Sequence, residues 1–194
     1  MNEFLIFLQM GFQHICDVKG YDHMLFILVL YAGYSYKEWK KLIILISAFT
    51  IGHSISLALS VFKVILVNKN AVEILIAVTI LATSIGNLIF KDKNSNSTTS
   101  NFSYIIALIF GFIHGIGFSS FFNELMGDMM QITLPLFAFN VGLELGQLLI
   151  LLLLFLTYFF INKIRPIQQR SWTILISGAG IGVSLLMILE RIKL

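Results

Sequence analysis

Six ionisable side chains lie in or at the edge of apolar stretches of this sequence, where lipid or a protein interior would surround them. They are four histidines and two carboxylates, namely His14, Asp22, His23, His53, His114 and Glu144. A carboxylate at mid-bilayer costs about 2.5–3.5 kcal/mol on insertion scales, so such groups face a protein interior and have a partner there. Imidazole and carboxylate groups together suit a divalent transition metal such as nickel, copper, cobalt or zinc. A lone histidine in such a place is more often a hydrogen-bonding group between helices, but the six together favour a shared metal site.

Polar side chains accompany two of these residues on the same helical face. Asn140 and Gln147 stand four residues before and three residues after Glu144, so the three share one side of a helix. Ser56 shares a face with His53 in the same way. We expect these side chains to support the site from the interior of a helix bundle.

The composition indicates that the elements that position this site lie in a membrane. Hydrophobic residues make up 58% of the 194 residues and charged residues only 12%, about half the charged share of an ordinary globular protein. A soluble fold cannot cover so much apolar surface, so part of it must face lipid. The net charge of +3 comes from short basic loops, which points to membrane topology and not to nucleic acid.

The hydropathy pattern predicts an all-α integral membrane protein that forms a single transmembrane domain, with a bundle of six transmembrane helices. The predicted spans are 22–36, 39–62, 71–90, 104–125, 132–160 and 171–190. Residues 3–16 are apolar but short for a span of about 20 residues, and they fit an interfacial helix, a re-entrant segment or a seventh span. A polar loop at 91–103 separates two groups of spans, and no internal repeat is evident.

The loop charges predict the orientation. The loops at 37–41 and 163–170 are basic, and the positive-inside rule places them in the cytoplasm, with Asp22 at the outer face. Counting residues along each span then puts the six ionisable groups in the outer half to the middle of the bundle. We expect the protein in a bacterial inner membrane, with the lipid bilayer and a metal ion as its partners.

Glycines recur at four-residue spacing in three of the predicted spans. The pairs are Gly111 with Gly115, Gly142 with Gly146, and Gly178 with Gly182. Small residues at this spacing let helices approach closely, so that side chains from different helices converge. We predict that all three pairs are helix-packing positions.

Five stretches, in order, resemble the second branch of the HupE/UreJ family. They are "GFQHICDVKGYDHMLFILVL", "FTIGHSISLALS", "VEILIAVTI", "GFIHGIGFSS" and "FNVGLELGQL". The resemblance implies a membrane metal permease, chiefly for nickel, that supplies the maturation of metalloenzymes such as hydrogenase and urease. It also implies that the six ionisable residues named above form the metal pathway.

The sequence departs from the family pattern at two places. Seven residues separate His14 from Asp22, where the family usually has five. In "TSIGN", Gly86 precedes Asn87 where family members often carry an acidic residue. Asn87 is therefore a polar candidate without a charge beside it.

Two functions from different classes remain open at this stage, and transport is favoured over catalysis. The first is a secondary metal permease, and no nucleotide-binding motif is present to drive it. The second is an intramembrane zinc hydrolase, in which Ser54, Ser56 or Ser119 would assist a metal-activated water. An accessory or sensor subunit is a third reading, and a homo-oligomer or maturation proteins are possible partners.

Overall fold

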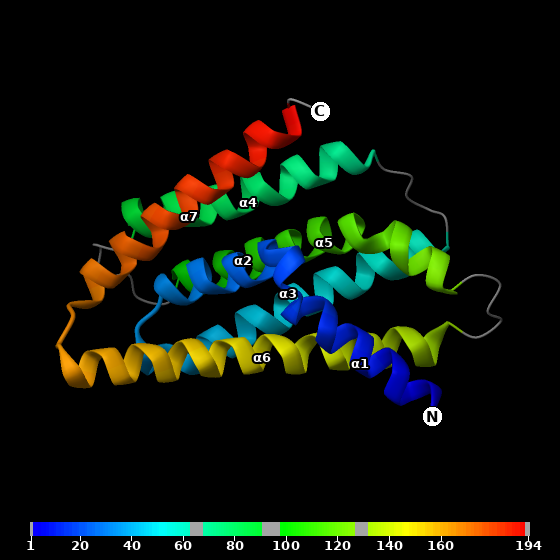
Figure 1. The fold of residues 1–194 in the computed structure, drawn as a ribbon, viewed down its shortest axis with the longest axis horizontal. Coiled ribbons are helices and arrows are strands. Elements are labelled where there is room, and N and C mark those ends of the chain that lie inside the picture. Colours follow the sequence, from blue (N-terminus) through cyan, green and yellow to red (C-terminus); the bar gives the residue numbers. More distant parts are fainter. Residues whose placement is uncertain (1, 63–67, 91–97, 127–131, 193–194) are drawn as a thin grey trace.

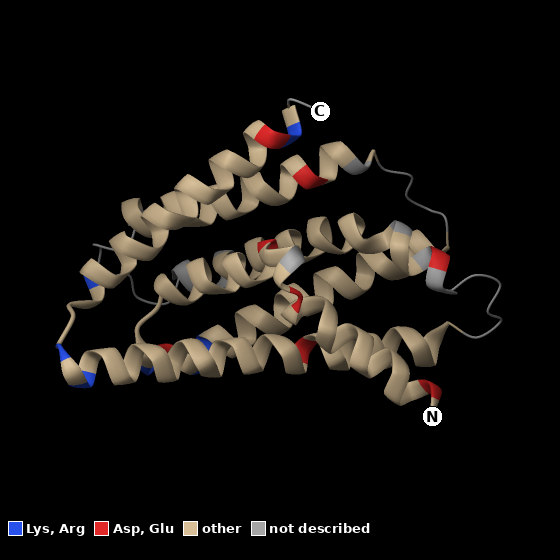
Figure 2. Cartoon of the chain, in the orientation of Figure 1, with Lys and Arg blue, Asp and Glu red and all other residues tan. Residues whose placement is uncertain are grey.

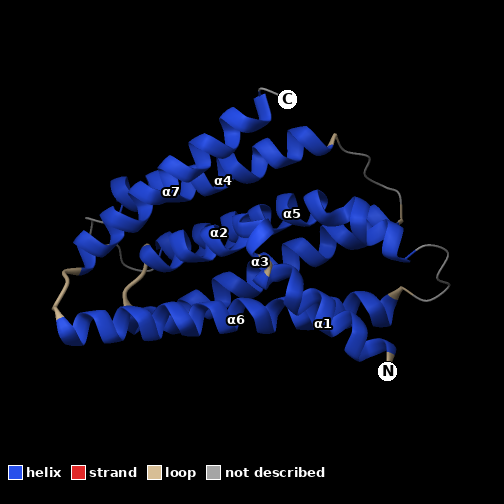
Figure 3. Cartoon of the chain, viewed as in Figure 1, coloured by secondary structure: helices blue, strands red, loops and turns tan. Residues whose placement is uncertain are grey.

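The computed structural model of the protein describes residues 2–62, 68–90, 98–126 and 132–192. This part of the chain is helical, without strands, as the composition predicts (Figures 1 and 3). Its α-helices are α1 (Glu3–Cys16), α2 (Tyr21–Ala32), α3 (Trp39–Val61), α4 (Lys69–Phe90), α5 (Thr98–Met126), α6 (Thr133–Ile164) and α7 (Gln169–Ile192). Short 3-10 helices, η1 (Val18–Gly20) and η2 (Tyr36–Glu38), precede α2 and α3.

Four of the helical segments are long and apolar enough to cross a membrane. They are Tyr36–Val61, Asn70–Ile89, Thr133–Ile164 and Gln169–Ile192. Tyr21–Ala32 and Ser103–Ser119 are apolar but shorter. The structure therefore confirms the all-α class and four helices long and apolar enough to span a membrane, and it does not confirm the predicted count of six spans.

The predicted span 22–36 is wrong at its C-terminal end, because α2 stops at Ala32. Ser35 and Glu38 form a capping box, in which the backbone N–H of Ser35 donates to Glu38 Oε2 at 3.0 Å. Such a cap satisfies the free N–H groups of a new helical turn, so the chain starts a second helix here and does not extend the first.

The polar loop predicted at 91–103 is also shorter than expected. Helix α5 begins at Thr98, so the C-terminal part of that segment is helical, and residues 91–97 lie outside the described residues.

Helices α1 and α2 together form an interrupted helix. Their 14 and 12 residues give lengths of about 21 and 18 Å, each too short for a hydrocarbon core of about 30 Å. Helix α1 ends and α2 begins near the middle of the bundle, and both run towards the same end of it (Figure 1). Two half-length helices that meet inside the bundle have the geometry of the discontinuous helices at transporter binding sites.

Helix α1 crosses α6 through glycines. Gly11 faces the backbone of Phe139, and Gly142 faces the backbone of Leu8. A Cβ atom at either glycine would meet a carbonyl group of the other helix. Further along both helices, Gly146 faces the last turn of α1, so the two helices run in the same direction.

Helix α3 crosses α5 in the same manner. Gly52 faces the backbone of Leu108, and Gly111 faces the backbone of Phe49. Gly115 then faces the next turn of α3, so this pair is parallel too. The close approach brings the polar residues of both helices into the same interior.

The two crossings are built from the same short motifs. The first motif reads "GFQH" at 11–14 in α1 and "GFIH" at 111–114 in α5; the second reads "FNVG" at 139–142 in α6 and "FTIG" at 49–52 in α3. In both crossings the glycine of the first motif packs on the phenylalanine that opens the second. Helices α1 and α6 run opposite to α3 and α5 (Figure 1), so the two crossings have opposite orientations in the fold.

The third predicted glycine pair is not a packing site. An added Cβ atom at Gly178 or Gly182 would meet nothing within 4 Å. Gly180, between them, is the close contact of α7, where a Cβ atom would lie 2.5 Å from Ser84 Oγ and 2.6 Å from Val29 Cγ2. Three glycines at alternate positions cannot share one helix face, because neighbours two apart point about 200° away from each other.

The buried core and the exposed apolar surface are both consistent with a membrane protein. Phe26, Phe49, Phe122 and Phe139 are among the largest fully buried side chains. The outward faces of α6 and α7 carry large exposed apolar residues, including Leu152, Leu153, Phe159, Phe160, Leu175 and Leu186. An apolar exterior of this extent suits contact with lipid.

The two basic loops lie at the same end of the molecule. Gln169 Nε2 donates a hydrogen bond to the carbonyl oxygen of Tyr34 at 3.0 Å, which ties the start of α7 to the turn before α3. The Lys and Arg residues of 37–41 and 163–170 lie at this end (Figure 2).

Candidate metal centre

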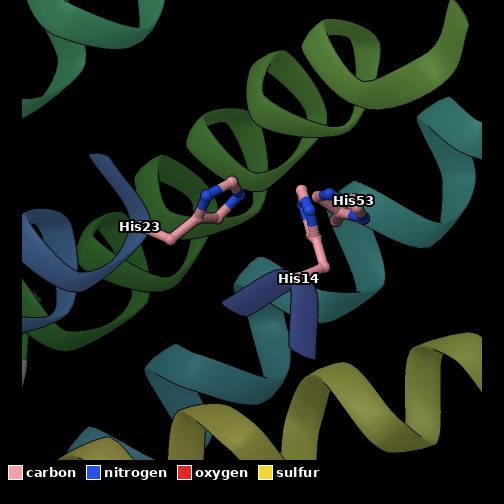
Figure 4. A group of neighbouring side chains, drawn as sticks. All are labelled: His14, His23 and His53. Carbon is pink, nitrogen blue, oxygen red and sulfur yellow. The ribbon is translucent and has the colours of Figure 1, made fainter. Parts of the chain in front are cut away.

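Three histidines from three helices meet inside the bundle. His14 of α1, His23 of α2 and His53 of α3 each offer one ring nitrogen, and these nitrogens lie within 4.8 Å of one another (Figure 4). The ring centroids are 4.8 Å apart for His14 and His23, and 6.1 Å apart for His14 and His53. Nitrogen ligands of a tetrahedral metal lie about 3.4 Å apart, so a small inward movement of the rings would complete a metal site.

The glycine crossings and the break between α1 and α2 position these rings. His14 lies three residues after Gly11, and His53 directly follows Gly52, so each ring is carried by a helix held close to its neighbour. His23 lies in the first turn of α2, just beyond the break. It is 5% exposed and His53 is fully buried, so these two rings lie in the protein interior.

Asp22 holds the ring of His23 from behind. The Nδ1–H of His23 donates to Asp22 Oδ1 at 3.1 Å, and the backbone N–H of His23 donates to the same oxygen at 3.0 Å. This assigns the proton to Nδ1 and leaves the Nε2 lone pair for a ligand. A carboxylate behind a histidine is the common outer partner of metal sites, where it fixes the ring and raises its basicity.

His114 of α5 supplies a fourth imidazole beside the three. Its Nδ1–H donates to the carbonyl oxygen of Phe110 at 2.8 Å, which again leaves Nε2 with a lone pair. The ring centroid lies 5.2 Å from that of His23, and the residue is 1% exposed. His114 is outside the three-histidine group but close enough to join it through rotation of its side chain.

The four histidines keep five buried ring nitrogens without a hydrogen-bond partner in the described structure. These atoms are Nε2 of His14, His23 and His114 and both ring nitrogens of His53. Buried polar side-chain atoms nearly always have a partner, and leaving one without costs about 1–3 kcal/mol. A cluster of such atoms at one point indicates that a ligand satisfies them.

Glu144 lies apart from this group. Ser47 Oγ donates to Glu144 Oε1 at 2.6 Å, and one turn further along, Thr50 Oγ1 donates to Gln147 Oε1 at 2.8 Å. Ser47 precedes His53 by six residues, a rise of about 9 Å along α3. The structure therefore divides the predicted six-residue set into a histidine cluster with Asp22 behind it and a separate oxygen-rich step at Glu144.

Sequence analysis missed Ser47 and Thr50 as partners of this step. They precede His53 by six and three residues, so one polar stripe runs along α3 from the histidine cluster towards Glu144. Spacing of this kind is visible in the sequence, but serine and threonine are common in apolar helices, where they bond to their own backbone.

The other predicted polar residues have structural partners. Ser56 Oγ donates to the carbonyl oxygen of His53 at 2.8 Å, and Asn140 Nδ2 donates to that of Leu136 at 2.8 Å. Asn87 Nδ2 donates to the carbonyl oxygen of Val29 at 2.8 Å, at the far end of α2. Asn87 thus anchors the C-terminal half of α2 and lies away from the histidines in the fold.

Comparison with known proteins agrees with the resemblance in the sequence. No curated protein and no solved structure matches the chain. The family described as HupE / UreJ protein matches residues 1–191, which is essentially the whole chain. The chain belongs to the HupE/UreJ family.

Proposed function

We propose that the protein is a secondary membrane permease for a divalent transition metal, with nickel as the first candidate. The observation that carries the proposal is the cluster of His14, His23 and His53 at the break between α1 and α2. Imidazole nitrogens bind nickel, copper, cobalt and zinc in preference to the hard cations magnesium and calcium. Family membership points to metal transport independently of this geometry.

The histidines would replace water molecules around the cation. His14, His23 and His53 act as neutral ligands, and His114 joins them when its ring turns inward. Asp22 keeps His23 in the correct tautomer and places a negative charge next to the bound cation. The site has few charges, so it binds the cation weakly enough to release it.

The polar stripe on α3 provides the onward route. From His53 it leads to the hydrogen-bonded pair of Thr50 and Gln147 and then to Ser47 and Glu144. Glu144 would receive the cation as a hard oxygen ligand that balances its charge. The stripe runs towards the end of the bundle that carries the basic loops, which we assign to the cytoplasm under the positive-inside rule.

The two oppositely oriented crossings favour transport over catalysis. In many secondary transporters, inverted repeats meet at a central binding site that opens alternately to the two sides. Here the crossings of α1 with α6 and of α3 with α5 contribute His14 and His53 respectively to one site. A hydrolase has no need for two opposed halves around its metal.

The serine hydroxyls give a second reason to set the hydrolase aside. Ser54 Oγ donates to the carbonyl oxygen of Thr50, and Ser119 Oγ donates to that of Ile116. Ser56 makes the same kind of bond to its own helix. The hydroxyl groups of all three serines therefore donate hydrogen bonds to backbone carbonyl groups of their own helices.

Metal binding and uptake measured together test the proposal. We expect purified protein to bind Ni²⁺ and cells that express it to accumulate ⁶³Ni. His53→Gln should lower the affinity about 100-fold, or ~2.8 kcal/mol, and abolish uptake at limiting metal. Thr157→Ala is the matched control, because Thr157 is an exposed residue of α6 whose hydroxyl bonds to its own helix. Wild-type protein that neither binds nor transports nickel, cobalt, copper or zinc would refute the proposal.

A further inference from the structure

A cavity of about 160 Å³ lies between the start of α2, the start of α4 and the end of α7. Its charged lining residues are Asp22, Glu73, Glu190 and Arg191. Three carboxylates and one guanidinium give this lining a formal charge of −2. Nothing in the metal-binding mechanism above uses Glu73, Glu190 or Arg191.

An ion pair crosses this cavity from one helix to another. Arg191 Nε of α7 lies 2.8 Å from Glu73 Oε2 of α4. The Arg191 side chain is 43% exposed and that of Glu73 is 22% exposed. Such a partly exposed pair contributes little to stability, and it can exchange partners at low cost.

Asp22 joins the cavity to the histidine cluster. It lines the cavity, its side chain is 21% exposed, and its Oδ1 accepts the Nδ1–H of His23. Behind it, the buried Nε2 of His23 has no hydrogen-bond partner. One side chain therefore contacts the solvent-accessible cavity on one side and a candidate metal ligand on the other.

We propose that this cavity is the access route through which a divalent cation reaches the histidine cluster, and that Arg191 is its electrostatic gate. In the closed arrangement Arg191 neutralises Glu73 and adds a positive charge that repels the cation. An arriving cation competes for Glu73, displaces the guanidinium and moves on to Asp22. A negatively charged cleft raises the local cation concentration and the association rate. This inference rests on the proposed transport function.

Neutralising each half of the ion pair separately tests the gate. Arg191→Gln removes the basic lining residue, so initial ⁶³Ni uptake at limiting metal should rise about threefold, with the gain fading as salt is added. Glu73→Gln leaves the Arg191 charge unbalanced in the cavity, so uptake should fall about threefold. Both variants should change the apparent KM and leave the maximal rate and the equilibrium nickel stoichiometry as in the wild type.

The opposite signs separate a gate from a structural ion pair, whose loss would lower uptake in both variants. Lys41→Gln is the matched control, because Lys41 pairs with Glu38 at 2.8 Å at the other end of the bundle, and its uptake should equal that of the wild type. Equal effects of Arg191→Gln and Glu73→Gln, no effect of either, or an equal effect of Lys41→Gln would overturn the gate. Absence of uptake by the wild type would instead refute the proposed function.

Discussion

The crossing of α1 with α6 and the crossing of α3 with α5 use the same motifs, yet they end differently. In the second pair, His53 directly follows the crossing glycine and α5 continues beyond His114 to Met126. In the first pair, Leu143 stands where His53 stands in α3, and α1 stops two residues after His14. The continuous pair holds its ligands on intact helices, whereas the interrupted pair leads directly into the break that carries Asp22 and His23.

In the proposed mechanism, this difference gives the two crossings separate tasks. The α3–α5 pair supplies two imidazoles, those of His53 and His114, on continuous helices. The α1–α6 pair supplies one imidazole at a helix end, and on α6 the carboxylate of Glu144 follows two residues after Gly142. Under this proposal, metal binding depends on both crossings, while Glu144, the oxygen ligand for onward movement, belongs to the α1–α6 pair.

The largest expected effect concerns the crossings themselves. Gly111→Ala places a Cβ atom against the backbone of Phe49, which cannot move aside without separating α3 from α5. We expect a loss of about 4 kcal/mol of folding free energy and little folded protein in detergent, measured by thermal unfolding. Gly178→Ala is the same change at a site with nothing within 4 Å, and it should raise stability by about 0.5–1 kcal/mol. Equal behaviour of the two variants would contradict the packing assignment.

The next effect compares the equivalent histidines of the two pairs. His14 belongs to the three-histidine group, whereas His114 lies beside it. His14→Gln should therefore lower Ni²⁺ affinity about 100-fold, and His114→Gln only about tenfold, or ~1.4 kcal/mol. Isothermal titration of the purified variants measures both. A larger loss for His114 would mean that α5, and not α1, supplies the third ligand.

A smaller loss of Ni²⁺ affinity is expected from substitution of Asp22, the hydrogen-bond partner of His23. Asp22→Asn keeps the shape of the side chain and removes the charge that holds His23. Loss of such an outer partner lowers metal affinity by about 10–100-fold, and we expect the lower part of this range because the amide oxygen can still accept the hydrogen bond. Lys41→Gln, a charge change at the other end of the bundle, controls for nonspecific electrostatics. Affinity unchanged in Asp22→Asn would contradict the orienting role.

The smallest effect on binding is expected at Glu144. Glu144→Gln should leave equilibrium nickel binding within about twofold, because its partner Ser47 lies roughly 9 Å along α3 from His53. It should still lower the maximal uptake rate, since the onward route loses its charged ligand. Parallel measurements of binding and of ⁶³Ni uptake separate these effects. A fall in affinity as large as that of His14→Gln would return Glu144 to the histidine cluster.

The sequence predicts the helices and selects histidines that lie close together in the structure, because ionisable residues in apolar segments are a local signal. It does not predict the two matching crossings, since each motif of four residues packs against the other motif on a helix that is distant in the sequence. It also does not place Glu144, which shares an apolar helix with Gly142 but points to Ser47. The seven residues between His14 and Asp22 do not place the two side chains on one helix, because η1 interrupts the helix between them.

The break between α1 and α2 also has an electrostatic consequence. The last carbonyl groups of a helix have no intrahelical partner and give its C-terminus a partial negative charge, equivalent to roughly half an elementary charge. His14 lies in the last turn of α1, so this negative pole is directed at the histidine cluster. Asp22, in the first turn of α2, offsets the positive pole of the second helix. A continuous helix through the same residues would carry the same imidazoles without this field, and four neutral rings alone would attract a dehydrated cation less strongly.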